Sequence, residues 1–134
     1  STRIQDLQAL KLPNSISFLE RDLIKDGFSW LEWYDTAVLV DILHHLDEDT
    51  QMQLLLFLSQ HCKEIIIKDI DTTPRYKYYW NFFHDRYVMK NEVLCFLWSD
   101  RVESELTRNW FLVKREKVTS PFPYPHYMLI ASKK

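Results

Sequence analysis

The sequence contains a single glycine, Gly27, among 134 residues, where average usage of about 7% would give roughly nine. Glycine-rich loops bind phosphates and dinucleotides through closely approaching backbone N–H groups. No such loop can be built from this chain. Any function that depends on one must obtain it from elsewhere.

Other common signals are also scarce. The net charge is -2 at pH 7, so the excess of Lys and Arg that attracts nucleic acid is absent. The two cysteines, Cys62 and Cys95, show neither a CxxC nor a Cys/His ligand spacing, which predicts reduced thiols and no metal site. No apolar run approaches the ~20 residues that span a bilayer, and the N-terminus lacks a signal pattern. We therefore expect a cytoplasmic protein with no membrane span.

Apolar and aromatic residues are abundant. Hydrophobic residues make up 46% of the chain and aromatic residues 15%, a composition typical of ordered globular proteins. A chain of this length can bury one core and has no room for a second. The sequence predicts a single domain over residues 1–134.

The centre of the chain has a strand, helix and strand pattern. Residues Tyr34–Leu43 form an apolar and β-branched run, typical of a parallel strand that is covered on both faces. Asp47 can cap a helix that ends near His61. The run Glu64–Asp71 predicts a second β-branched strand. This spacing indicates a right-handed βαβ unit.

The flanking segments give a less regular pattern. Hydrophobic spacing, prolines and caps predict one helix and one strand before the central unit. After it they predict an aromatic helix, two further helices and two closing strands joined by a proline-rich connection. The predicted elements are helix Thr2–Leu12, strand Phe18–Asp22, helix Tyr76–Tyr87, helix Glu92–Trp98, helix Ser99–Arg108, strand Trp110–Val118 and strand His126–Ser132.

This order of elements resembles the second part of the class I S-adenosylmethionine-dependent methyltransferase domain. The most specific stretch is Tyr34–Leu46, which ends in Leu43-His44-His45-Leu46 and looks like the fourth strand and the turn after it. Ile65–Ile70 is similar to the fifth strand, and Tyr127–Lys133 to the last. The implied fold is an α/β, partial Rossmann-like methyltransferase sheet, from the third to the seventh strand, with flanking helices.

The resemblance also implies residues that bind the cofactor, S-adenosylmethionine. Asp22 stands where the family often places an acid that faces the adenine amino group, and Leu23 would pack beside the ring. An adenine needs an acceptor for its N–H group and apolar cover, which these residue types supply. Val40, Asp41 and Ile42 would line the methionine end.

The family's first two strands and its glycine-rich loop have no counterpart here. Since those strands lie between the third and the fourth, the resemblance predicts a gap in the sheet. Unpaired edges of buried strands are costly. We therefore expect a fragment of a longer enzyme, or a chain that a partner chain or a second copy completes.

Three histidines are candidates for proton transfer. His44 and His45 follow a strand end, the edge where open α/β sheets bind ligands, but either could instead cap or pack under the next helix. His84 next to Asp85 is a weaker candidate, because neighbouring helical side chains point in different directions. The pair Asp69 and Asp71 could ligate a metal, cap the next helix or face the cofactor.

The leading interpretation is methyl transfer from S-adenosylmethionine to a small, apolar or aromatic acceptor, with the aromatic segment 76–87 as core, lid or acceptor pocket. The main alternative is an inactive methyltransferase-like interaction or regulatory module that lacks the cofactor loop. A third interpretation, an unrelated small α/β binding protein, predicts a continuous sheet with no adenine cleft beside Asp22.

Overall fold

The computed structural model describes residues 16–17, 19–70, 99–109, 111–116 and 126–134, with single positions at 5, 6, 9, 79, 83, 86, 87 and 118. The chain divides into two units, Ser1–Trp30 and Leu31–Lys134. The second unit holds every strand of the described sheet.

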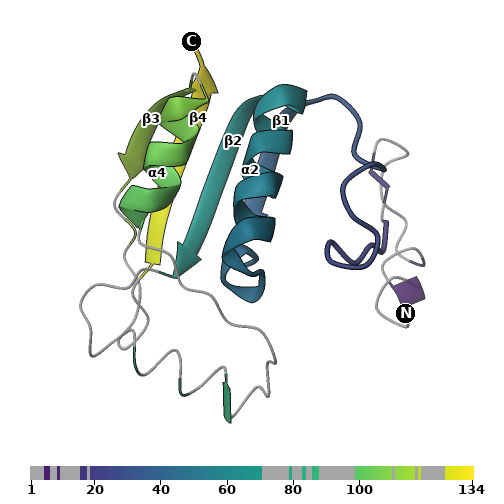
Figure 1. The fold of residues 1–134 in the computed structure, drawn as a ribbon. Coiled ribbons are helices and arrows are strands. Elements are labelled where there is room, and N and C mark those ends of the chain that lie inside the picture. The colour runs from purple at the N-terminus through teal and green to yellow at the C-terminus, as the bar shows by residue number, and fades with distance from the viewer. Residues whose placement is uncertain are drawn as a thin grey trace. The chain divides into compact units, whose positions relative to one another are not determined.

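The described residues of the second unit form a four-stranded sheet in the order β1-β2-β4-β3 (Figure 1). Strand β2 runs parallel to β1 and antiparallel to β4, and β4 runs antiparallel to β3. The elements are β1 (Tyr34–Val40), the 3-10 turn η1 (Leu43–His45), α2 (Glu48–His61), β2 (Cys62–Ile70), α4 (Ser99–Arg108), β3 (Phe111–Glu116) and β4 (His126–Lys133).

Helices α2 and α4 cover one face of the sheet and contact each other (Figure 1). Alternate residues of the strands point toward them, because successive side chains of a strand face opposite ways. Ile67, Leu129 and Ala131 are fully buried on this face, and Leu54 and Val102 meet them from the helices, with 2% and 0% of their surface exposed. This layer is the core of the second unit.

Several predicted elements are confirmed. Helix Ser99–Arg108 has the bounds that were expected, and the helix capped by Asp47 ends at His61. The strands predicted at Glu64–Asp71 and His126–Ser132 form as β2 and β4, with no end shifted by more than two residues. Most of the predicted helices Thr2–Leu12 and Tyr76–Tyr87, and all of Glu92–Trp98, lie outside the described residues.

The prediction that Tyr34–Leu43 is a strand covered on both faces is wrong. Strand β1 ends at Val40, because Asp41 takes a left-handed conformation with φ 52. In the described part of the chain β1 pairs only with β2, so it is an edge strand. Val38 and Val40 are 58% and 49% exposed on the face away from the helices, since no described element covers them.

The strand expected at Phe18–Asp22 is also not formed over its described residues, 19–22. The Asp22 carboxylate accepts hydrogen bonds from the backbone N–H groups of Ile24 and Lys25. An aspartate that binds the backbone two and three residues ahead stabilises a turn in place of a strand. The gap predicted within the sheet is therefore absent from the described strands, whose edge is β1.

The only glycine of the sequence follows this turn. Gly27 has φ +65, a backbone conformation that side chains with a Cβ rarely adopt. Its carbonyl accepts a hydrogen bond of 2.7 Å from the Trp30 indole. The single glycine therefore stands where the backbone of the first unit requires it.

Asp47 caps α2. Its carboxylate accepts hydrogen bonds from the N–H and the hydroxyl of Thr50, at 3.1 and 2.5 Å. These bonds, the hydroxyl first, hold the pKa of Asp47 below its usual value. We expect Asp47→Ala to lower the melting temperature by several degrees, whereas Asp47→Asn, which also caps helices, has a smaller effect. Thermal unfolding followed by circular dichroism measures this.

The pH dependence gives a second test of the same cap. A carboxylate with a lowered pKa in the folded state stabilises above its unfolded pKa of about 3.8, and this contribution is lost as the pH falls through the folded pKa. The difference in melting temperature between wild type and Asp47→Ala should therefore shrink below about pH 4. An equal difference at all pH values would mean that the cap is not formed by the carboxylate.

Candidate functional site

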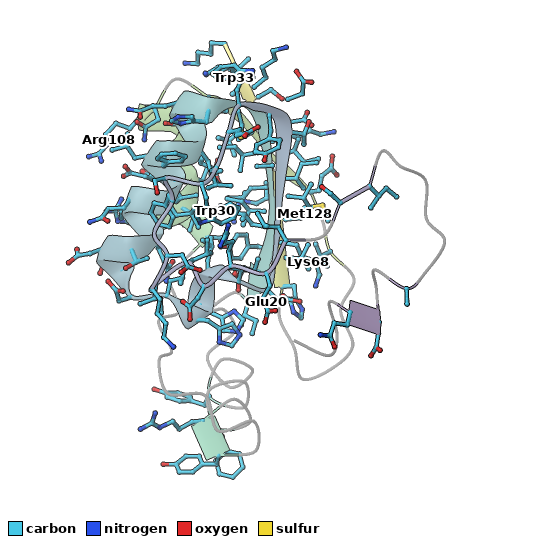
Figure 2. The ribbon with its side chains drawn as sticks, turned by 90° about the vertical axis from the view of Figure 1, so that its right-hand side faces the viewer. Glu20, Trp30, Trp33, Lys68, Arg108 and Met128 are labelled. Atoms are coloured by element: carbon cyan, nitrogen blue, oxygen red, sulfur yellow. The ribbon has the colours of Figure 1, made fainter. Side chains whose placement is uncertain are left out.

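The candidate site lies at one edge of the sheet, where the parallel strands β1 and β2 both end. Because β4 runs the opposite way, it begins at this edge, with His126 paired to Ile70. Open α/β sheets bind ligands at the carboxyl ends of their strands. Figure 2 shows Lys68 beside Met128 toward this edge and Trp33 at the other end of β1.

Asp41 is the first residue after β1 and the centre of a charged cluster. Its carboxylate lies 3.3 Å from Lys68 Nζ and 3.5 Å from His126 Nε2, and its backbone N–H donates to the Lys68 carbonyl at 2.8 Å. Aspartate is one of the few side chains that adopt the left-handed conformation readily. The residue type therefore fits both the backbone turn and the charge of its neighbours.

One oxygen of Asp41 has no hydrogen-bond partner among the described residues. Oδ1 is buried and accepts no hydrogen bond from the described part of the chain, although His126 Nε2 lies nearby. A buried acceptor without a hydrogen bond is uncommon and calls for an explanation such as a ligand or water. An anionic acceptor at this position suits a ligand group that carries N–H donors or positive charge.

A second, buried cluster lies at the end of β2. The Asp69 carboxylate is 2.6 Å from His44 Nδ1 and accepts 2.8 and 2.7 Å hydrogen bonds from the N–H groups of Leu43 and Ile70. His44 and Asp69 are both buried. His45, the next residue, is half-buried, and its ring centroid lies 4.0 Å from that of His44.

The structure brings together the predicted residues that follow β1. Val40, Asp41, Ile42, His44 and His45 all belong to the end of β1 or to the turn after it. Val40 is half-exposed on the face away from the helices, and Ile42 is half-buried. Their roles in binding and catalysis stay predictions.

The other predicted residues are not joined to this cluster. Asp22 and Leu23 belong to the first unit, where the backbone N–H groups of Lys25 and Ile24 hold the pKa of Asp22 below its usual value. Asp22 is largely exposed and Leu23 is half-buried. His84 and Asp71 lie outside the described residues.

Sequence reasoning missed Lys68 and His126 as members of the site. Lys68 stands inside an apolar run and faces Val40 and Met128 on the neighbouring strands. Only the register of the strands places it next to Asp41. A charged residue in the second half of a β-branched strand was the available signal, because such a side chain needs a partner when it is half-buried.

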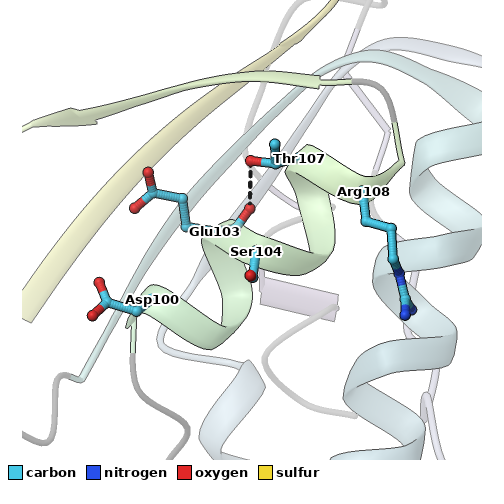
Figure 3. Close-up of a pocket in the computed structure, with 5 residues that line it drawn as sticks. All are labelled: Asp100, Glu103, Ser104, Thr107 and Arg108. Atoms are coloured by element: carbon cyan, nitrogen blue, oxygen red, sulfur yellow. Dashed lines mark hydrogen bonds between the residues drawn. The ribbon is translucent and has the colours of Figure 1, made fainter.

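A hollow on the surface of α4 is separate from this edge. Asp100, Glu103, Ser104, Thr107 and Arg108 line it from one stripe of the helix, and the Thr107 hydroxyl donates to the Glu103 carbonyl at 2.9 Å (Figure 3). None of the residues predicted for the site contributes to it. Asp100 and Glu103 pair with Arg115, and Arg108 pairs with Glu105, so we do not assign a function to it.

No three His, Cys, Asp or Glu side chains of residues 19–70, 99–109, 111–116 and 126–134 are grouped so that they could hold a metal ion. No helix in the described part of the chain is both long enough and apolar enough to cross a membrane.

Comparisons with known proteins were made for the whole chain. No family model matches it. No curated protein sequence matches it either. Solved structures do match.

Magnesium protoporphyrin IX methyltransferase from Synechocystis PCC 6803, with bound S-adenosylhomocysteine, aligns over 98% of this chain and 57% of its own, with a TM-score of 0.70 and 16% identity. An S-adenosylmethionine-dependent methyltransferase from Archaeoglobus fulgidus aligns over 86% of this chain and 66% of its own, with a TM-score of 0.67 and 19% identity. An O-methyltransferase family protein from Burkholderia thailandensis aligns over 87% of this chain and 35% of its own, with a TM-score of 0.67 and 14% identity.

The fold of this chain is that of the class I methyltransferases. The resemblance drawn from Tyr34–Leu46 and the later strands is thereby confirmed for the fold. The chain spans about a third to two thirds of the length of these methyltransferases. The described sheet is accordingly a partial class I methyltransferase sheet, with flanking helices on one face.

Proposed function

We propose that this chain is part of an enzyme that transfers a methyl group from S-adenosylmethionine to a small, apolar or aromatic acceptor. The observation that carries the proposal is the methyltransferase fold together with a charged cluster at the edge of the sheet where β1 and β2 end. Similar solved structures include one with S-adenosylhomocysteine bound. The acceptor class rests on the aromatic segment predicted at 76–87.

The residues at this edge fit the cofactor in one respect that can be tested. S-adenosylmethionine carries an ammonium group and a sulfonium, and the sulfonium supplies a methyl group that is already activated for transfer. The buried Asp41 Oδ1 is an acceptor without a hydrogen bond in the described residues, which suits a cationic ligand group. Val40 and Ile42, on either side, offer apolar contact to the rest of the ligand.

The chain's own contribution to the reaction is chiefly alignment. Holding an acceptor in line with the methyl group replaces a bimolecular encounter by an intramolecular one. A hydroxyl acceptor also needs a group that takes its proton, and a histidine does this near neutral pH. We assign that role to His45, because it is half-buried beside the strand end whereas His44 is buried against Asp69.

Calorimetric titration of S-adenosylhomocysteine into the chain tests the proposal. We expect micromolar binding, at least tenfold weaker in Asp41→Ala because this variant removes an acceptor for ligand N–H groups. Asp35→Ala is the matched control, since Asp35 is an aspartate of β1 at the opposite end of the strand.

The absence of binding by a folded sample would contradict the proposal for this chain and favour the inactive interaction or regulatory module. Equal weakening by Asp35→Ala would place the ligand elsewhere. A cytoplasmic location, a single domain over 1–134, and a homo-oligomer or partner chain that completes the sheet stay predictions.

A further inference from the structure

The buried carboxylate of Asp69 joins β2 to the turn η1, which follows β1. One oxygen, Oδ2, accepts from Leu43 N–H, and the other, Oδ1, accepts from His44 Nδ1 and from Ile70 N–H. Only 2% of Asp69 is exposed. A buried carboxylate is costly unless donors surround it, and all three donors here are in place.

The turn does not need Asp69 for its own backbone shape. His45 N–H donates to the Ile42 carbonyl at 3.1 Å, and Leu46 N–H donates to the Leu43 carbonyl at 2.9 Å. These bonds already close a 3-10 turn. What Asp69 adds is the placement of the turn against β2 and the orientation of the His44 ring.

The contact with Asp69 also selects one state of His44. A carboxylate accepts hydrogen bonds, so the Nδ1 atom that faces it carries a hydrogen. The ring is thereby fixed in both tautomer and direction. Because its centroid lies 4.0 Å from that of His45, with 41° between the planes, a fixed His44 ring restricts where the His45 ring can lie.

We propose that Asp69 is a positioning residue of the methyl-transfer site: it holds His44, and through the His44 ring it sets the position of His45 at the ligand-binding edge. The part of this inference that concerns methyl transfer rests on the proposed function. Asp69 itself contacts neither acceptor nor cofactor. Of the two histidines, His44 is then a second positioning residue and His45 is the one that takes a proton.

The variant Asp69→Asn tests this inference, because an amide replaces one acceptor oxygen by a donor that faces Leu43 N–H, or else His44 and Ile70 N–H. The readout is the set of long-range ¹H–¹⁵N correlations of the histidine rings, which report the tautomer of each ring. We expect wild-type His44 to show the Nδ1–H form, and the variant to lose this signature and to shift the ring resonances of His45.

Two further variants separate positioning from loss of stability. Val102→Ala removes a fully buried side chain of α4 and should destabilise without changing either histidine. His44→Asn keeps an N–H donor for Asp69 but removes the ring, so it should fold even if Asp69→Asn does not and should still shift the His45 resonances. Unchanged His45 resonances in His44→Asn, or a His45 shift of equal size in Val102→Ala, would overturn the inference.

Titration of S-adenosylhomocysteine into the same samples distinguishes the two proposals. If wild type binds, we expect Asp69→Asn to bind roughly tenfold more weakly, since misplacing a turn beside a ligand weakens its contacts, and Val102→Ala to bind as wild type does. A wild type that does not bind contradicts the proposed function alone. The ring correlations still decide the role of Asp69.

Discussion

Replacing Ile67 by alanine is expected to lower the free energy of unfolding by about 2–5 kcal/mol, the usual range for a large aliphatic side chain in a core. Ile67 is fully buried, between Leu39 on β1 and Leu129 on β4, and faces the helices. Alanine would leave a cavity that the surrounding sheet and helices can only partly fill. Urea unfolding of the variant measures the loss.

Ile66 provides the control, because it precedes Ile67 on the same strand and points to the other face. Its neighbours are Val38 and Ile130, and it is half-buried. We expect Ile66→Ala to cost only about 1 kcal/mol, in proportion to the apolar area that it removes from water. Equal losses for the two variants would mean that something covers this face in solution.

The sequence was sufficient to predict the elements whose signals are local. The cap at Asp47 and the acidic start and basic end of helix Ser99–Arg108 lie within a few residues of the elements that they define. The β-branched run that forms β2 is equally local. Three of the described elements, α2, α4 and β2, could therefore be placed before any tertiary contact was known.

Burial and pairing could not be predicted in the same way. The run Tyr34–Leu43 reads as a central strand by composition, but whether Val38 and Val40 are covered depends on segments that pack against them. At Phe18–Asp22 the apolar alternation was outweighed by the side-chain to backbone bonds of Asp22, which favour a turn.

The sequence predicts only part of the candidate site, because strand ends are visible in it and strand pairing is not. Asp41, His44 and His45 follow a strand, and a strand end is visible in the sequence. Lys68 and His126 join Asp41 only through the registers of β1 with β2 and of β2 with β4, which depend on contacts between distant residues. Asp69 is also a candidate from the sequence, but its hydrogen bond to His44 depends on the parallel pairing of β1 with β2.

Replacing Glu105 by glutamine is expected to lower the free energy of unfolding by about 1–2 kcal/mol at pH 7, because hydrogen bonds to a charged group are stronger than those to a neutral one. Glu105 lies on α4 with 3% of its surface exposed. Its carboxylate accepts 2.7 and 2.8 Å bonds from Arg108 and a 3.2 Å bond from Arg101. Glutamine keeps the shape and removes the charge.

The pH dependence identifies the charge as the cause. Burial by itself raises the pKa of Glu105, but the bonds from Arg108, Arg101 and Asn109 outweigh it and leave the pKa below its usual 4.5. A carboxylate whose pKa is lower in the folded state contributes its full stability at pH values above the unfolded pKa. This contribution is lost as the pH falls through the folded pKa. The difference in the free energy of unfolding between wild type and Glu105→Gln should therefore be constant near neutral pH and shrink toward about pH 3.

Glu48→Gln is the matched control for Glu105, since its carboxylate also faces Arg101, at 4.0 Å, but is 56% exposed. Exposed ion pairs contribute little because water screens them, so this variant should unfold much as wild type does at every pH. If Glu105→Gln instead differed from wild type by the same amount at neutral and acidic pH, the loss would come from side-chain packing. The two arginines would then not stabilise α4 through the charge of Glu105.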